Sequence, residues 1–216
     1  MQTLIADTPA VAIRRVSVSS MDNNVYLLTS KRSGQQILLD AADDPDAIRA
    51  LLAEAAADGP APSVAVIVTS HAHADHVQAL AALVAHTGAR TVAGRADAAS
   101  ITRQTGVVPQ PVDDGDAVRV DGIELSVIGL RGHTPGSIAL AYAEPGQPVQ
   151  LFTGDSLFPG GPGRTTPATF DQLMDHLEAR VFAVYPDDTL VWPGHGLPTT
   201  LGAERPHLPQ WRARRW

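Results

Sequence analysis

The chain has 216 residues, of which 44% are hydrophobic and 18% charged, a composition typical of a globular protein with a sizeable buried core. Its formal net charge of −7 excludes an extensive basic face, so we expect no nucleic-acid partner. The chain has no cysteine, which excludes disulfides, thiolate metal ligands and a cysteine nucleophile.

Strands and helices are predicted to alternate in the first half of the chain. The predicted elements are strands at 11–18, 24–30 and 35–41, a helix at 44–59, a strand at 63–70, a helix from 77 to 87, a strand at 90–94 and a helix at 96–104. The run at 63–70 is continuously apolar, which is typical of a strand buried on both faces. It ends directly at His71, so the polar residues that follow lie on a strand-to-helix connection.

Strands joined by tight turns dominate the second half. The predicted elements are strands at 117–120, 123–130, 137–143 and 149–154, a helix at 170–184 and a strand from 188 that runs into His195. The turns between the strands are of hairpin size, which favours layered sheets over a doubly wound sheet. We therefore predict one α/β domain over residues 1–216, in two halves that divide near residue 110. A short tail of helix and coil follows from about residue 200.

The N-terminal residues show no basic leader followed by an apolar run, and no segment approaches the ~20 apolar residues that a membrane-spanning helix needs. We therefore expect a cytoplasmic protein without a membrane partner. The oligomeric state is left open.

The segment "TSHAHADH" at residues 69–76 is the densest group of metal-binding side chains in the chain. In an extended segment alternate side chains point the same way, so His71 and His73 can approach one ion together. Asp75 and His76 come where the chain turns into a helix and can face a second ion. Imidazole and carboxylate ligands suit zinc, iron or manganese.

Three more residues of ligand type follow strands in the second half. His133, Asp155 and His195 each stand at a strand-to-loop junction beside small residues. Together with the cluster they make seven ligands, enough for two ions that share one carboxylate. The remaining histidines, His86, His176 and His207, are predicted to be surface residues.

Four motifs in this order, "SHAHADH", "GHTPGS", "TGDSLF" and "PGHG", resemble the metal motifs of the metallo-β-lactamase superfamily. The resemblance is closest to its glyoxalase II (hydroxyacylglutathione hydrolase) branch and covers residues 20 to 200. It implies a four-layer αββα sandwich with two divalent metal ions at one edge. The usual proline before the "GHT" motif is replaced by Arg131, for which we expect little effect on the metal.

The resemblance also implies a role for each motif residue. The first ion would be held by His71, His73 and His133, and the second by Asp75, His76 and His195. Asp155 would bridge the two ions, and Asp40 would support the ligands from behind. Gly163 and Arg164, in a Gly-rich loop, would border the substrate pocket. Asp75 would also act in catalysis by orienting the attacking hydroxide.

The implied activity is that of a binuclear metallohydrolase, in which a metal-bridging hydroxide attacks the carbonyl of a small thioester. Zinc is the expected metal, with iron and manganese as alternatives. Full-length glyoxalase II carries its basic glutathione-binding residues in a C-terminal helical domain with no counterpart in these residues. The thiol carrier, glutathione or another low-molecular-weight thiol, therefore stays open.

Three other functions remain at this stage. A persulfide dioxygenase would use a single iron held by His71, His133 and Asp155. A lactonase or other ester hydrolase would use the same two ions. A non-enzymatic module would use the metals for stability alone. The first two take a small molecule as their partner, as does the thioester hydrolase.

Overall fold

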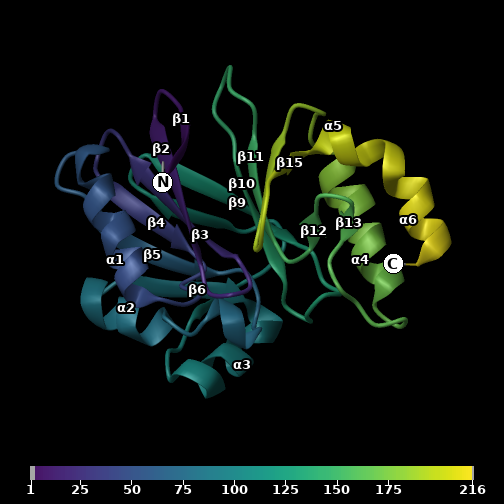
Figure 1. The fold of residues 1–216 in the computed structure, drawn as a ribbon, viewed down its shortest axis with the longest axis horizontal. Helices are drawn as coiled ribbons and strands as arrows, with labels where there is room; N and C mark the ends of the chain where they lie inside the picture. Colours follow the sequence, from purple (N-terminus) through teal and green to yellow (C-terminus); the bar gives the residue numbers. More distant parts are fainter. Residues whose placement is uncertain (1–2, 216) are drawn as a thin grey trace.

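The computed structural model describes residues 3–215, which form four layers in the order helix, sheet, sheet, helix (Figure 1). The two large sheets have seven and six strands, and a two-stranded hairpin lies beside the second. This arrangement confirms the predicted αββα sandwich.

The first sheet follows the chain order. Its strands are β1 (Leu4–Asp7), β2 (Val11–Val18), β3 (Asn23–Ser30), β4 (Gln35–Leu39), β5 (Ser63–Thr69), β6 (Arg90–Gly94) and β7 (Gln110–Val112). The first four pair antiparallel, whereas β4 to β7 pair parallel. Parallel strands bring their carboxyl ends to one edge of a sheet. Asp40 after β4, His71 after β5 and Asp97 after β6 therefore start from the same edge.

The second sheet has the order β15-β14-β11-β10-β9-β8. Its strands are β8 (Ala117–Val120), β9 (Ile123–Gly129), β10 (Ile138–Tyr142), β11 (Gln150–Gly154), β14 (Leu190–Pro193) and β15 (Thr199–Thr200). Because β10 is antiparallel to both β9 and β11, and β11 is parallel to β14, the strands β9, β11 and β14 run the same way. The loops with His133, Asp155 and His195 follow these three strands. The hairpin of β12 (Leu157–Phe158) and β13 (Gly161–Pro162) comes after Asp155.

Apolar side chains from both sheets form the central core, with Leu28, Val66, Leu125 and Phe152 among its buried members. The outer face of the first sheet is covered by α1 (Pro45–Glu54), α2 (Leu80–Thr87) and α3 (Arg95–Thr105). The second sheet is covered by α4 (Phe170–Leu177), α5 (Leu201–Glu204) and α6 (Leu208–Arg214). Short turns of helix at Ala55–Ala57, Ala74–His76, Glu178–Phe182 and Arg205–His207 complete the elements.

The predicted elements agree with the structure for the long strands and helices. The first sheet ends at Val112 and the second begins at Ala117, close to the predicted division near residue 110. The strands β1, β7, β12, β13 and β15 were not predicted, because runs of two to four residues show little or no alternation. The equally short β8 was predicted, since its valines alternate between two turns.

The tail is more ordered than the predicted mixture of helix and coil. Residues 201–214 are helical, and Trp211 is buried against the ring of Phe182, with the ring centroids 6.2 Å apart. No helix within residues 3–215 combines the length and apolar character needed to cross a membrane.

Candidate metal centre

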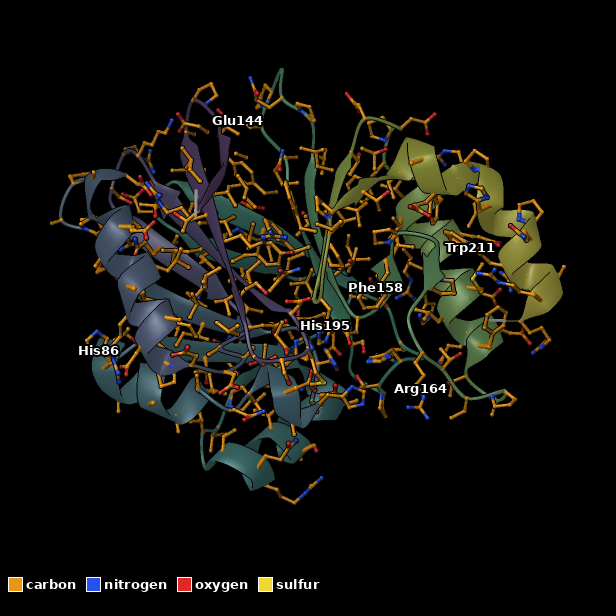
Figure 2. All side chains as sticks on the ribbon, viewed as in Figure 1. His86, Glu144, Phe158, Arg164, His195 and Trp211 are labelled. Atoms are coloured by element: carbon orange, nitrogen blue, oxygen red, sulfur yellow. The ribbon has the colours of Figure 1, made fainter. Side chains whose placement is uncertain are left out.

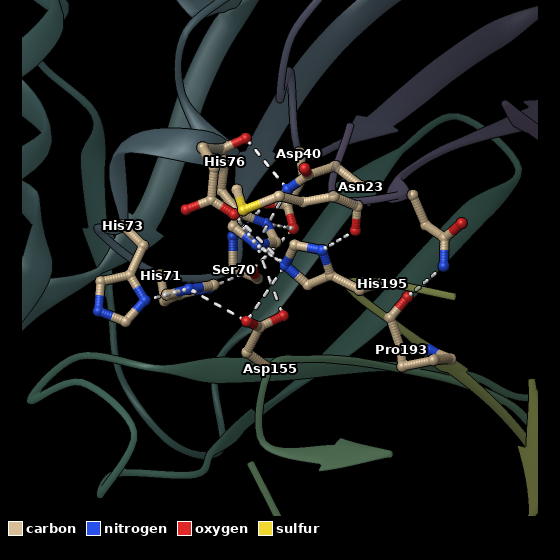
Figure 3. Close-up of polar contacts among 12 residues, drawn as sticks. Asn23, Asp40, Ser70, His71, His73, His76, Asp155, Pro193 and His195 are labelled. Atoms are coloured by element: carbon tan, nitrogen blue, oxygen red, sulfur yellow. Dashed lines mark hydrogen bonds and ion pairs between the residues drawn. The ribbon is translucent and has the colours of Figure 1, made fainter. Parts of the chain in front are cut away.

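Seven histidine and aspartate side chains meet at the edge where the carboxyl ends of both sets of strands converge. Figure 3 shows part of this arrangement, with His71, His73, His76, Asp155 and His195 labelled. They form two groups, within each of which the potential ligand atoms lie within 4.8 Å of one another. The first group is His71, His73, His133 and Asp155, and the second is Asp75, His76 and His195. Each of the seven residues singled out in the sequence therefore lies in one of the groups.

The first group centres on His73. Its Nδ1 atom lies 3.0 Å from Nε2 of His71 and 3.0 Å from Nε2 of His133. The Oδ2 atom of Asp155 is 3.5 Å from Nε2 of His133 and 3.9 Å from Nε2 of His71. Three ring nitrogens and one carboxylate oxygen thus point at a common volume.

The second group is equally compact. The Nε2 atoms of His76 and His195 are 3.1 Å apart, and Oδ2 of Asp75 lies 3.4 Å from the first and 3.3 Å from the second. Asp155 reaches this group too, with Oδ1 3.5 Å from Nε2 of His76 and Oδ2 3.4 Å from Nε2 of His195. Asp155 is therefore the one carboxylate that lies between the two groups.

Asp40 orients two of the imidazoles from the side away from the centre, His76 directly and His71 through Ser70. Its carboxylate accepts hydrogen bonds from the backbone N–H of Ser70 and from the Ser70 hydroxyl, each at 2.7 Å. Its Oδ2 atom also lies 3.0 Å from Nδ1 of His76, while the Ser70 hydroxyl lies 3.0 Å from Nδ1 of His71. When Nδ1 carries the proton and donates to these oxygens, Nε2 of the same ring is left with its lone pair toward the centre. Asp40 thus contacts both rings, one of them through Ser70, while its role in supporting metal ligands stays a prediction.

Backbone carbonyls orient two further imidazoles. The Nδ1 atom of His133 lies 2.7 Å from the carbonyl oxygen of Arg164, and Nδ1 of His195 lies 2.8 Å from that of Met21. Both Nδ1 atoms must donate to these acceptors, so Nε2 is directed inward and is the ring nitrogen that would bind a metal once it is deprotonated. Arg164 thus contacts the centre through its backbone, while its side chain is exposed.

Gly163 is buried against the backbone of Asp155. A Cβ atom at residue 163 would overlap the carbonyl oxygen of Asp155, so only glycine permits this close approach. Its N–H donates to the carbonyl oxygen of Ser156 at 3.1 Å. The contacts of Gly163 therefore hold the loop that carries Asp155.

Asp97 has a place at the centre that was not predicted from the sequence. This carboxylate is 2% exposed and accepts hydrogen bonds from the N–H of Ala72 at 2.9 Å, the hydroxyl of Thr134 at 2.6 Å and the N–H of Gly136 at 2.8 Å. It therefore joins the loop of His71 and His73 to the loop of His133. In the sequence Asp97 stands in the first turn of a helix that follows a buried strand. Aspartate is common in this position because it stabilises the helix N-terminus, so the pattern alone did not indicate a role at the site.

Asn23 is the second residue whose position was not predicted. Its amide donates to Oδ2 of Asp75 at 2.9 Å and to the Asp75 carbonyl at 3.2 Å, and its backbone pairs with His195. Asn23 and Asn24 are both almost fully buried. Two consecutive asparagines at the start of an apolar strand were the signal in the sequence, since buried amides require partners.

His176 is half-buried rather than a plain surface residue. Its Nδ1 atom accepts a hydrogen bond of 3.1 Å from the N–H of Arg131, so α4 contacts the loop of His133. His86 and His207 are exposed, as predicted.

The charges around the centre favour a cation. Burial and the neighbouring imidazoles hold the pKa of His71 well below its usual value, so that His71 is neutral. The carboxylate of Asp155 raises the pKa of His195 to about 9, against the opposing effect of burial. Neutral nitrogen ligands on one side and a carboxylate that attracts positive charge on the other are what a divalent cation requires.

One oxygen of Asp155 provides a further test of this fit. Its Oδ1 atom is buried and has no hydrogen-bond partner among residues 3–215, an arrangement that normally costs free energy. Gly194 packs against it, and a Cβ atom at residue 194 would overlap Oδ1. An unsatisfied carboxylate oxygen among imidazole nitrogens fits a metal ion, and the two groups together are consistent with a dinuclear site.

Residues 21–195 match the model of the Metallo-beta-lactamase superfamily, and the chain belongs to this superfamily. The two groups of histidine and aspartate are therefore found on the fold of a metal-dependent hydrolase family.

One curated relative and two solved structures show which members of the superfamily this chain is similar to. A hydroxyacylglutathione hydrolase of Chromohalobacter salexigens is 36% identical over 174 residues, which is 81% of this chain and 62% of the relative. The chain thus spans less than two thirds of the length of this relative. The crystal structure of ETHE1 from Myxococcus xanthus has a TM-score of 0.76 at 29% identity, covering 91% of this chain and 83% of that one. TTHA1623, solved in a di-iron-bound form, has a TM-score of 0.65 at 30% identity, covering 88% and 96%.

Proposed function

We propose that this chain is a binuclear metallohydrolase that cleaves a small thioester, in the manner of glyoxalase II. The observation that carries the proposal is the position of Asp155, whose carboxylate contacts His71 and His133 on one side and His76 and His195 on the other. The identity of 36% to a protein named hydroxyacylglutathione hydrolase supports this substrate class.

The ligand assignment follows the two groups. We assign His71, His73 and His133 to one ion, Asp75, His76 and His195 to the other, and Asp155 to both. Two ions so held would lower the pKa of a shared water toward neutrality and polarise the substrate carbonyl. Zinc is the proposed metal, and iron is an alternative that the di-iron-bound form of TTHA1623 supports.

The reaction consumes one water for each thioester. The water oxygen adds to the acyl carbon, the carbon–sulfur bond breaks, and a carboxylic acid and a thiol are released. A thiol with a pKa of about 8.5 leaves without a strong proton donor. Asp75, held by the amide of Asn23, is positioned to orient the attacking water through its carboxylate.

Metal content and a substrate panel test the proposal together. We expect two metal ions per chain by elemental analysis, with cleavage of hydroxyacyl thioesters faster than cleavage of lactones or simple esters. A single iron per chain, with oxygen uptake on a glutathione persulfide and no thioester cleavage, would indicate the dioxygenase and contradict the proposal. Preferred turnover of lactones would contradict the thioester class alone.

The His133→Ala variant tests the ligand assignment. Loss of one imidazole from the first group should lower thioester hydrolysis by about a hundredfold or more. The fold should be retained, as measured by circular dichroism. The matched control is His86→Ala, because His86 is exposed and belongs to neither group of proposed ligands. Turnover near that of the wild type in His133→Ala would show that the assignment is wrong.

A further inference from the structure

Four large apolar side chains are exposed in the described part of the chain. They are Met21, Val108, Val184 and Leu197, with exposed fractions of 53%, 76%, 61% and 73%. Single exposed apolar residues are common on protein surfaces. Met21 and Leu197, however, belong to two loops that meet at one of the proposed metal ligands, His195.

Hydrogen bonds tie these two loops together. The carbonyl of Met21 accepts from Nδ1 of His195 at 2.8 Å, and the N–H of Gly196 donates to the carbonyl of Asp22 at 3.1 Å. Leu197 follows directly after Gly196. Both exposed side chains are therefore attached within one or two residues of the contacts that position His195.

Phe158 adds a third apolar group beside the same histidine. Its ring centroid is 6.3 Å from that of His195, with an angle of 36° between the planes. Figure 2 shows both side chains at the middle of the molecule, between the sheets and the helices α4 and α6. Phe158 belongs to β12, so a third segment contributes to the same apolar region. We name Met21, Phe158 and Leu197 the apolar rim.

The other side of the metal centre differs in character. The loop of His133 carries Arg131, and the carbonyl that accepts from His133 belongs to Arg164; both arginines are exposed. Three segments that contact His195 thus carry apolar side chains, although Arg15 also donates to the carbonyl of Gly196 there at 3.0 Å. The loops beside His133 carry two exposed arginines instead.

We propose that the apolar rim binds an apolar acyl group of the thioester and makes the enzyme prefer acyl chains of several carbons. This inference rests on the proposed function and specifies its substrate class. Burial of the acyl chain against the rim removes apolar surface from water, and each methylene that gains contact raises kcat/KM by about two- to fourfold. The preference ends when the chain extends beyond the rim.

The first experiment compares acetyl, butanoyl and hexanoyl thioesters of one uncharged thiol on metal-quantified enzyme. We expect the ratio of kcat/KM for hexanoyl to that for acetyl to exceed about tenfold, from the methylenes that contact the rim. Met21→Gln and Leu197→Gln should each lower this ratio at least threefold. The Met21 substitution keeps the backbone carbonyl that accepts from His195.

Val108→Gln and Val184→Gln are the matched controls, because they remove the other two exposed apolar side chains. Both controls should keep the wild-type ratio. A flat chain-length profile in the wild type, or equal loss in the rim and control variants, would overturn the inference.

A binding measurement separates this inference from the proposed function. Thioethers with the same alkyl chains cannot be hydrolysed, and calorimetry gives their dissociation constants for the metal-loaded protein. Tighter binding of longer chains, lost in Met21→Gln and Leu197→Gln, would support the rim even if no thioester were cleaved. Binding that does not depend on chain length would refute the rim even if thioesters were cleaved.

Discussion

The carboxylate of Asp97 joins two loops that carry proposed metal ligands, although it contacts no imidazole itself. Its partners are the N–H of Ala72, between His71 and His73, and Thr134, next to His133. A buried carboxylate needs hydrogen-bond partners in place of the water that burial removes, and Asp97 has three. At the scale of the single residue, Asp97 therefore fixes the distance between ligands that are about 60 positions apart in the chain.

The variant Asp97→Asn tests this role. An amide nitrogen cannot accept a hydrogen bond, so at least one of the three donors loses its partner, at a cost of about 1–3 kcal/mol in stability. We expect metal binding to weaken about tenfold or more, as measured by competition with a chelator. Asp58→Asn is the control, since Asp58 is bound by Arg14 at 2.6 Å outside the metal centre and should affect stability alone. Unchanged metal affinity in Asp97→Asn would refute the role.

Gly194 is the second residue on which the centre depends. A Cβ atom at this position would overlap Oδ1 of Asp155 and lie 2.8 Å from Cε1 of His76. We expect Gly194→Ala to displace the shared carboxylate and reduce the metal content of the purified protein below one ion per chain. Gly202→Ala is the control, because a Cβ atom there would also meet a close neighbour, the Cβ atom of Asp187 at 2.9 Å, but outside the two groups of proposed ligands. Full metal content in Gly194→Ala would contradict the bridging position of Asp155.

The C-terminal helices support the site at the scale of secondary structure. Glu204, which ends α5, accepts from the N–H of Gly160 at 2.9 Å, and Arg214 of α6 donates to the carbonyl of Gly160 at 3.2 Å. Gly160 lies in the turn between β12 and β13, and β12 carries Phe158. The tail thus holds the hairpin that flanks His195 and packs into the core of the second sheet through Trp211.

Trp211→Ala tests whether α6 is an integral part of the fold. Removal of this fully buried ring should lower the free energy of unfolding by about 3–5 kcal/mol. Chemical denaturation of the metal-loaded protein measures the change. His207→Ala, at an exposed position of the same segment, should have no measurable effect. A loss below about 1 kcal/mol in Trp211→Ala would mean that the tail is only loosely attached.

The proposed metal centre connects both sheets at the scale of the whole molecule. His71, His73, Asp75 and His76 follow the first sheet, whereas His133, Asp155 and His195 follow strands of the second. Ions held by both sets of residues would therefore resist separation of the two halves. Removal of the metal should affect global stability as well as activity.

Thermal unfolding with and without a strong chelator measures this effect. Free metal at a hundredfold excess over its dissociation constant adds about 2.7 kcal/mol for each site that it fills independently. For a chain of this size one such site corresponds to a Tm difference of about 5–10 °C, which is the least that we expect. Added zinc should restore the higher Tm. Identical Tm values for the two preparations would show that the ions do not join the two halves.

The sequence by itself determined the residues of the two groups and the layered fold. Buried strands show as apolar runs, and the ligand-type residues stand directly after them, so local pattern was enough to place His71, His133 and His195 at strand ends. The αββα fold and the membership of the superfamily are confirmed, while the metal roles of the seven residues stay a prediction.

Only the tertiary structure decided how the site is supported and what surrounds it. Asp97, Asn23 and the apolar rim act through contacts between segments far apart in the chain, and such contacts leave no periodicity in the sequence. The distances across the centre depend on the order and direction of β9, β11 and β14, which pairing between strands sets. Ligand types are therefore a local property of the chain, whereas their geometry and the substrate's surroundings arise from packing.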